Sequence, residues 1–279
     1  MSQVDTEKFD DLKVIMIVAP LLSKSGYGTH ARSIANALIR NKMAHVIVGM
    51  THWGSTADYD ASELELGPLY VTRAEVGKQF IESKQVSSVS LQVCLPDEFK
   101  PEIAHFNILS TAAVESDKIP EAWVGKINQA DLVHVPSSFT KNVLVSNGCE
   151  EHKIHVIPLV VGLEYDASEQ FSSDLDQILE PFSKAVLTAG AWQVQTPLYQ
   201  DRKALDETIK CFMLAYAGKQ DTVLLVKSHA IDPDDPRDID LCASRIMHIA
   251  NDVGLQPDQT PPIRLVHGHL DSNQMASLF

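Results

Sequence analysis

Short apolar runs alternate with amphipathic segments from the start of the chain. Residues 13–19 and 44–49 are apolar and rich in β-branched side chains, and Ala31, Ala35 and Leu38 recur between them at helical spacing. A strand, a helix and a second strand in this order form a right-handed crossover, which places the two strands parallel in one sheet. The pattern therefore predicts an α/β fold with parallel sheets.

The same alternation continues in two series. In the first, further strands are predicted at 69–72, 91–94, 103–106, 131–135 and 154–158. In the second, strands are predicted at 185–189, 222–227 and 263–267, with helices over 203–217 and up to Gly254. An acidic stretch without periodicity, residues 164–176, separates the two series. At 279 residues the chain is long enough for two domains, which we place at residues 1–175 and 176–279.

The second series is short. A doubly wound lobe has about five or six strands, whereas three are predicted after residue 176, and a further helix expected near Asn273 has hardly begun at Phe279. The pattern predicts that the second lobe is incomplete and that the sequence is truncated at its C-terminus. Apolar surface left uncovered in such a lobe would favour self-association.

The chain is strongly acidic. It has 37 Asp and Glu residues against 23 Lys and Arg residues, a formal net charge of -14. This charge repels phosphate backbones and anionic lipid surfaces, so we expect no nucleic-acid partner. The longest apolar run, Val14 to Leu22, is far below the roughly 18 residues of a membrane span, and no basic region precedes it as in a secretory signal. We therefore expect no transmembrane segment and a cytoplasmic location.

Neither a disulfide framework nor a metal site is predicted. The cysteines are far apart and form no C-x-x-C pair, so we expect free, buried thiols at Cys94, Cys149, Cys211 and Cys242. His267 and His269 could share a metal ion, but they have no third ligand at a suitable spacing. The acidic run 232–240 lacks the spacing and the glycine of an EF-hand and is predicted to be a solvated loop.

A glycine-rich turn around Gly26 and Gly28 is the first candidate binding site. The motif G-x-G-x-x-A at residues 26–31 lies between a predicted strand and a predicted helix, where backbone N–H groups can approach an anion or a sugar. A dinucleotide site is the weaker interpretation, because the turn is long and residues 50–52 contain no acidic side chain for a ribose. An NAD-dependent oxidoreductase is therefore an alternative function, and a plain turn is the structural alternative.

A pair of cations, Arg202 and Lys203, opens a predicted helix of the second series. Positive side chains at a helix start are unfavourable next to the positive end of the helix dipole. A bound diphosphate would compensate them, with Arg202 offering a planar fork and Lys203 a point charge. The alternative is a solvated pair balanced by Asp201 and Asp206.

Several segments, taken in order, resemble family 4 glycosyltransferases, also called group 1 glycosyltransferases. They are ESDKIPEAWV at 115–124, DLVHVPSSF at 131–139, Gly148 and KIHVIP at 153–158. Three further segments match the family pattern in the same order: SGYG at 25–28, the Arg202–Lys203 pair and RLVHGHL at 264–270. The resemblance covers nearly the whole chain, and the order of the motifs carries it more than any single motif does.

The resemblance implies a GT-B fold with two Rossmann-like lobes, the first binding mainly an acceptor and the second mainly a nucleotide-sugar donor. It implies a retaining hexosyltransferase that moves a hexose from a nucleotide-diphosphate sugar to a glycan, a lipid or a small molecule, without a metal or other cofactor. By position, Gly26 and Gly28 would approach the donor phosphates or sugar. Arg202 and Lys203 would neutralise the diphosphate, on which charge develops as the glycosidic bond breaks.

The resemblance also supplies two candidate catalytic residues, His105 and Glu115. His105 stands where such enzymes often have a histidine near the transferring sugar, and a structural role beside a strand is the alternative. Glu115 would bind the acceptor or brace the cleft, and a surface carboxylate is the alternative.

Two features depart from the family pattern. The family usually has glycine where this chain has Ala204, and the later segment with two glutamates that holds the ribose and hexose of the donor is absent. A non-catalytic GT-B-like binding protein is therefore a further alternative function.

Overall fold

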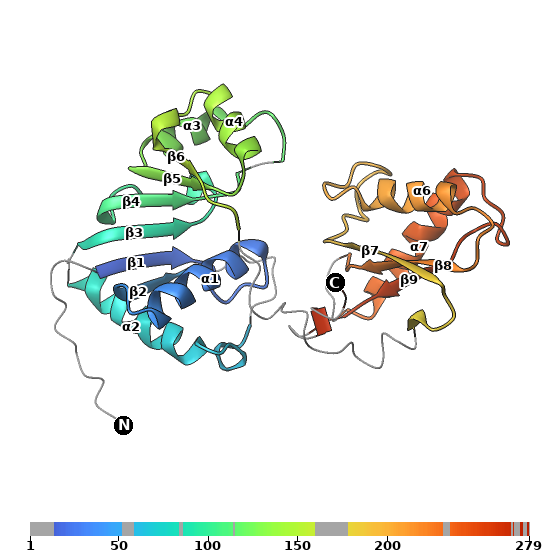
Figure 1. Cartoon of the computed structure of the whole chain (residues 1–279), viewed down its shortest axis with the longest axis horizontal. Coiled ribbons are helices and arrows are strands. Elements are labelled where there is room, and N and C mark those ends of the chain that lie inside the picture. Colours follow the sequence, from blue (N-terminus) through green and yellow to red (C-terminus); the bar gives the residue numbers. More distant parts are fainter. Residues whose placement is uncertain are drawn as a thin grey trace. The chain divides into compact units, whose positions relative to one another are not determined.

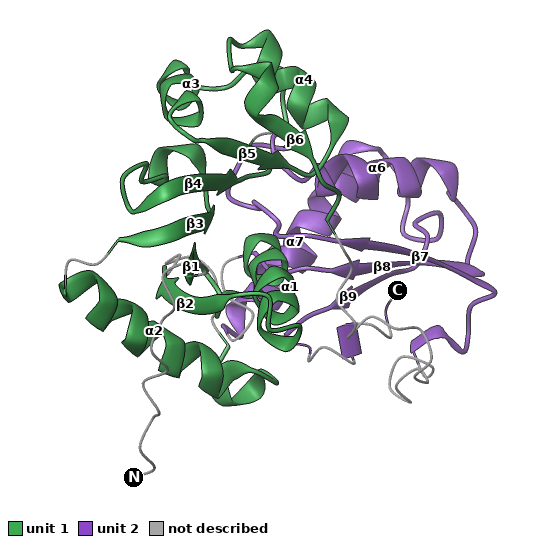
Figure 2. Cartoon of the chain, turned by 60° about the vertical axis from the view of Figure 1, so that its left-hand side comes forward, with its two compact units in different colours: residues 1–162 green, residues 163–279 purple. Residues whose placement is uncertain are grey.

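The computed structural model describes residues 14–51, 59–83, 86–113, 115–159, 178–230, 235–268, 270, 274–275 and 278. The chain divides into two compact units, Met1–Gly162 and Leu163–Phe279 (Figure 2). Each unit has its own sheet, and no described strand of one sheet pairs with the other. The predicted domain boundary after residue 175 falls within residues 160–177, outside the described residues.

Six parallel strands form the sheet of the first unit (Figure 1). They are β1 (Val14–Ala19), β2 (His45–Met50), β3 (Ser87–Val93), β4 (Ala104–Ser110), β5 (Leu132–Val135) and β6 (Ile154–Val156). Their order across the sheet is β2-β1-β3-β4-β5-β6, and every neighbouring pair is parallel. β1 lies inside the sheet and consists only of apolar residues, as expected of a strand covered on both faces. The parallel α/β sheet predicted from the sequence is confirmed.

Helices connect these strands: α1 (Gly26–Arg40), α2 (Gly67–Glu82), α3 (Glu121–Asn128) and α4 (Ser138–Ser146). Local hydrogen bonds define the start of two of them. The Ser25 hydroxyl accepts a hydrogen bond from the Gly28 N–H at 3.2 Å, and the Ser137 hydroxyl accepts one from the Thr140 N–H at 3.1 Å. Gly148 follows α4 with a φ of 98°, a left-handed conformation that glycine adopts readily after a helix.

The strand predicted at 69–72 is wrong, because these residues lie in α2. A run of four residues cannot distinguish a short strand from part of a helix. Pro68 suits the first turn of a helix, and Phe80 is buried. Gly77 lets α2 approach the sheet, since a Cβ built there would lie 2.6 Å from the Val48 carbonyl oxygen of β2. Packing against β2 therefore decided the conformation of this segment.

Three parallel strands form the sheet of the second unit among its described residues: β7 (Lys184–Ala189), β8 (Thr222–Lys227) and β9 (Ile263–Val266). β8 is the central strand, and all its residues except Lys227 are buried. α6 (Leu205–Ala215) follows β7 and α7 (Arg237–Asp252) follows β8. The start of the helix expected near Asn273 falls within residues 271–273, outside the described residues.

The cysteine prediction is right for three of the four thiols. Cys94, Cys149 and Cys242 are buried and free. Cys211, in α6, is exposed, because the buried face of this helix includes Ile209, Phe212 and Met213, and position 211 lies off that face.

Within the part of the chain that the structure describes, we find no helix with both the length and the apolar character needed to cross a bilayer.

Candidate functional site

Open α/β sheets bind ligands at the carboxyl ends of their strands, and the turn between β1 and α1 lies at that edge of the first sheet. Its two glycines have different surroundings. A Cβ built on Gly28 would lie 2.1 Å from the Ser23 carbonyl oxygen and 2.9 Å from that of Pro20, so this glycine lets the loop fold back on the helix start. A Cβ built on Gly26 would meet no described atom within 4 Å. Gly26 therefore leaves open space, whereas Gly28 serves the packing of the turn.

Three side chains from three elements form a hydrogen-bonded chain at the same edge. His134 of β5 contacts the Ile157 carbonyl oxygen through Nε2 at 2.7 Å and the Ser110 hydroxyl through Nδ1 at 2.7 Å. Ser110, the last residue of β4, also contacts Nε2 of His30 in α1 at 3.2 Å. A carbonyl oxygen only accepts, so Nε2 of His134 donates to Ile157, and in the tautomer with this proton Nδ1 is the acceptor for the Ser110 hydroxyl. Nε2 of His30 then donates to the Ser110 oxygen. Each of these three hydrogen bonds therefore has an assigned donor and acceptor.

His30 is held neutral at this position. Burial lowers the pKa of His30 to about 4, and protonation of His134, whose ring centroid is 5.2 Å away, would lower it in the same direction. With its proton on Nε2, the neutral ring can only accept at Nδ1. This Nδ1 is buried and has no hydrogen-bond partner among the described residues. An unsatisfied buried polar atom costs about 1–3 kcal/mol. We therefore expect His30 to lower the free energy of unfolding of the first unit.

A second polar contact ties the loop after β4 to α1. The Tyr27 hydroxyl lies 3.1 Å from the Thr111 hydroxyl and accepts a hydrogen bond from the Ala112 N–H at 2.9 Å. Burial raises the pKa of Tyr27 although these hydrogen bonds act in the opposite direction, so the phenol stays protonated at neutral pH. Ala113 has a φ of 53° at this bend. The loop that leaves β4 is therefore fixed against the start of α1.

The structure places His105 and Glu115 differently with respect to this edge. His105 is the second residue of β4, exposed and five residues before Ser110, which is about 16 Å along a strand. It lies at the amino edge of the sheet, so the structure does not bring it together with His30 and His134, and the role predicted for it does not fit this placement. Glu115 is exposed in the loop that leaves the carboxyl end of β4. Of the two, only Glu115 is on a segment that leaves the candidate edge.

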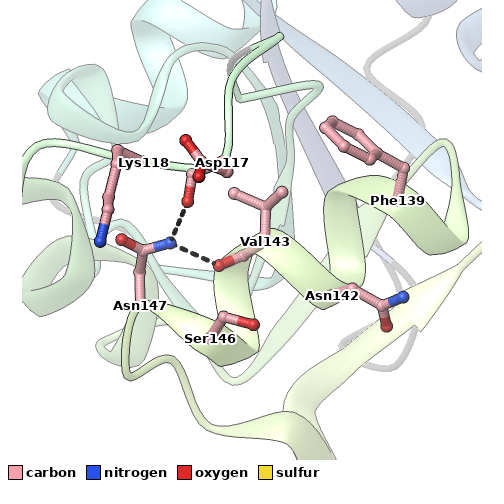
Figure 3. Close-up of a pocket in the computed structure, with 7 residues that line it drawn as sticks. All are labelled: Asp117, Lys118, Phe139, Asn142, Val143, Ser146 and Asn147. Carbon is pink, nitrogen blue, oxygen red and sulfur yellow. Dashed lines mark hydrogen bonds between the residues drawn. The ribbon is translucent and has the colours of Figure 1, made fainter.

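A shallow hollow of about 320 Å³ lies beside α4 (Figure 3). One of its lining residues is Asn147, whose Nδ2 donates to the carbonyl oxygens of Asp117 at 2.9 Å and Val143 at 2.8 Å. The lining contains none of the site residues predicted from the sequence: Asp117, Lys118, Phe139, Asn142, Val143, Ser146 and Asn147.

One buried carboxylate organises the loop between β7 and α6, residues 190–204. Asp206 is fully buried and accepts hydrogen bonds from Trp192 Nε1 at 2.9 Å, from the Tyr199 N–H at 2.9 Å, and from Nε and Nη2 of Arg245 in α7. Burial by itself would raise the pKa of Asp206, but the hydrogen bonds, with that of Arg245 the largest, hold the pKa below its ordinary value. Asp206 is thus ionised and ties the loop to α7.

A second buried carboxylate caps α6. Asp201 accepts hydrogen bonds from the N–H groups of Leu205 at 2.9 Å and Asp206 at 3.3 Å. Both carboxylates are buried and engaged in the protein, whereas Arg202 and Lys203 are exposed, as the alternative of a solvated cation pair predicts. Ala204 has a φ of 54°, a left-handed conformation that disfavours alanine.

Lys203 and Lys227 lie at the carboxyl edge of the second sheet. A Cβ built on Gly190, just after β7, would lie 3.6 Å from Cβ and Cγ of Lys203, so the lysine stem lies over the end of β7. The Gly190 N–H donates to the Lys227 carbonyl oxygen at 3.1 Å, and the Ser228 hydroxyl donates to the Gly190 carbonyl oxygen at 2.6 Å. Lys227 Nζ donates to the carbonyl oxygen of Gly268, which follows β9, at 2.5 Å. The Lys227 ammonium group and the stem of Lys203 therefore lie at this edge.

The acidic run predicted to be a solvated loop contains a buried residue. Asp238, in the first turn of α7, is fully buried. Its carboxylate accepts the Ala230 N–H at 2.8 Å and lies 3.0 Å from His267 Nε2. The prediction is wrong for this residue, because its partners come from the ends of β8 and β9. His269 lies outside the described residues, and the structure holds no group of three metal-ligating side chains among those it describes.

Comparison with known proteins gives structural neighbours only. Neither a family model nor a curated protein matches the sequence. HepE from Anabaena, solved with UDP and glucose, has a TM-score of 0.54 at 12% identity, covering 95% of this chain and 71% of its own. OtsA has a TM-score of 0.55 at 11% identity, with 95% and 76% coverage. MnaA from S. aureus, solved with UDP, has a TM-score of 0.51 at 15% identity, with 96% and 71% coverage.

These similarities define the fold. The neighbours are GT-B proteins, and the two parallel α/β units of this chain have the GT-B architecture predicted from the sequence. At identities of 11–15% the likeness extends to the fold and not to the ligand. The chemistry of this chain depends on the residues at the carboxyl edges of its two sheets.

Proposed function

We propose that this protein is a family 4 glycosyltransferase that binds a nucleotide-diphosphate sugar and transfers its hexose, with retention, to an acceptor. The observation that carries the proposal is the cationic carboxyl edge of the second sheet, where the Lys203 stem lies over the end of β7. A cluster of cations in a protein of net charge -14 runs against the overall field and suits a small anion. The GT-B fold, and UDP in the solved structures of HepE and MnaA, support a nucleotide sugar as that anion.

Arg202 and Lys203 are assigned to the diphosphate. Asp201 already occupies the first N–H groups of α6, so neutralising charge comes from side chains and not from the helix start. Negative charge grows on the diphosphate as its bond to the sugar breaks, and a guanidinium fork with an ammonium group stabilises that charge. This neutralisation needs no metal ion.

The carboxyl edge of the first sheet is assigned to the sugar and the acceptor. Gly26 leaves space for a ligand beside the start of α1. Glu115, on the exposed loop after β4, supplies a carboxylate for an acceptor hydroxyl. Gly28 contributes indirectly, because it allows the turn that presents Gly26 to form.

Calorimetric titration of the full chain with UDP, GDP and ADP, each with and without EDTA, tests the donor site. We expect at least one nucleoside diphosphate to bind, with no effect of EDTA. Lys203→Ala should weaken that binding by about 10- to 150-fold, equivalent to the roughly 1.5–3 kcal/mol of a hydrogen bond to a charged group. Arg202→Lys should also weaken it, because lysine lacks the fork. Lys184→Ala, an exposed lysine at the amino end of β7, is the matched control.

The possible outcomes separate the alternatives. Absence of binding by all three nucleotides, or unchanged affinity in both variants, would refute the assignment, and a strict need for a divalent metal would contradict metal-free neutralisation. Binding of a sugar nucleotide without transfer to a glycan, a lipid, a small molecule or water would identify a non-catalytic binding protein. Saturable fluorescence titration with NADH would instead support the oxidoreductase.

A further inference from the structure

Lys227 is an unusual cation in the second unit. It is the last residue of β8, the central strand, so it stands at the carboxyl edge between the ends of β7 and β9. Its neighbours in register are Ala189 and Val266, the last residues of those two strands. The side chain is partly buried, and burial lowers the pKa of Lys227.

The ammonium group of Lys227 has no acidic counterpart in the part of the chain that the structure describes. Its side-chain hydrogen bond goes to the neutral carbonyl oxygen of Gly268. Other lysines do have carboxylate partners: Lys153 lies 3.2 Å from Glu150, and Lys210 lies 3.4 Å from Asp252. The contrast is sharp in a protein with 37 acidic residues.

Burying a charge without a partner is costly, and buried charges in proteins are normally paired. A lysine that only supported the fold could be replaced at lower cost by an apolar side chain of similar length. Lys227 Nζ has three N–H donors, and among the described residues its side-chain hydrogen bond goes to Gly268 alone. An anionic ligand would supply further acceptors and the missing charge together.

The surroundings indicate which anion. The Lys227 backbone is joined to Gly190, and the stem of Lys203 lies over Gly190. The Lys203 stem therefore lies at the end of β7, and the Lys227 ammonium group lies by the residue that follows β9, so both lysines belong to the carboxyl edge of the same sheet. A diphosphate carries charge on both phosphoryl groups, so it can take more than one cation.

We propose that Lys227 is a further ligand of the diphosphate of the nucleotide sugar, acting beside Arg202 and Lys203. The proposal rests on the function proposed above. It adds a residue from the centre of the sheet, which is held in position by the strand itself and by the Gly268 carbonyl oxygen. Lys227 is then the rigid member of the cation group, whereas Arg202 and Lys203 lie on a loop.

The test is Lys227→Met, which keeps the length of the apolar stem and removes the charge. Calorimetry with UDP, GDP and ADP should show at least about a tenfold loss of affinity for the nucleotide that wild type binds, the effect of one lost charged hydrogen bond. Lys184→Met, with the same change in net charge at the opposite edge of the sheet, should bind as wild type does. The nucleoside without phosphates should bind wild type and Lys227→Met equally.

Three results decide the matter. Wild-type affinity in Lys227→Met overturns this inference and leaves the proposed function intact. Failure of wild type to bind any of the three nucleotides removes both. An equal loss in Lys184→Met overturns the inference too, because it assigns the effect to general electrostatics.

A second measurement covers the case in which Lys227→Met fails to fold. The lysines of the folded wild-type chain are reductively methylated with ¹³C, and the Lys227 resonance is assigned through Lys227→Arg. Because a phosphate favours the charged form of a nearby ammonium group, bound UDP, GDP or ADP should raise the pKa of Lys227. An unchanged pKa at saturating nucleotide overturns the proposal.

Discussion

Asp206→Asn tests how the loop of residues 190–204, which carries the cation pair, is held. Asp206 accepts four hydrogen bonds: one from Trp192, one from the Tyr199 backbone and two from Arg245. Its own side chain is fully buried, and that of Arg245 is only 10% exposed. The change from carboxylate to amide keeps the shape, removes the negative charge and turns one acceptor into a donor.

The expected cost follows from the buried guanidinium. Breaking a buried ion pair by removing one partner costs about 3–5 kcal/mol, because the other charge stays desolvated. Since whole domains are stable by only about 5–15 kcal/mol, we expect Asp206→Asn to lower the free energy of unfolding of the second unit by about 3–5 kcal/mol. Nucleotide affinity should fall as well, because the loop loses its attachment to α7.

Urea unfolding of the full chain measures the change in unfolding free energy. Amide hydrogen exchange in α6 and α7 shows whether the loss lies in the second unit. Asp240→Asn, an exposed carboxylate of α7, is the control and should stay within about 0.5 kcal/mol of wild type. Adding Arg245→Met to Asp206→Asn should recover part of the loss, because the stranded charge is then gone. An unfolding free energy of Asp206→Asn within about 1 kcal/mol of wild type would refute the reasoning, since the pair would not be the desolvated one described.

Two further predictions concern the first unit. Gly28→Ala should lower the free energy of unfolding by about 1–3 kcal/mol through overpacking. Gly26→Ala should be tolerated, because the added Cβ meets open space. Equal losses of unfolding free energy for both variants in urea titrations would contradict the different roles of the two glycines. The pKa of His30 is about 4 in the folded state, below its ordinary 6.5, so the unfolded chain binds the proton more tightly. Stability should therefore decline as the pH falls from about 6.5 to about 4, and His30→Gln should flatten this decline in unfolding free energy; an unchanged slope would count against the assignment.

The order and type of most elements could be predicted from the sequence. The parallel β-α-β start and the three strands of the second unit are present close to their predicted positions. These features depend on hydrophobic periodicity within one element, which a short window of sequence contains. The strand predicted at 69–72 failed because its window was too short and because contact with β2 favoured the helix.

Some residues of the candidate site could be predicted from the sequence and others could not. The cation pair at 202–203 and the glycine turn at 26–28 were found because their residues are adjacent in the sequence. The burial of Asp201 and Asp206 could not be predicted from the sequence, because it depends on a loop that folds back over the start of α6. His105 was misplaced because its distance from the functional edge depends on where β4 begins and ends.

The sequence by itself determined the alternation of strands and helices, the local caps at Ser25 and Ser137, and the two segments that carry candidate anion contacts. Only the tertiary structure decided which distant residues meet. Ser110 contacts His30, although the two residues are 80 positions apart in the sequence. Lys227 is partly buried because β8 is the central strand of its sheet. Local signals depend on neighbours within a few residues, whereas burial and charge pairing depend on the strand order and packing of the whole unit.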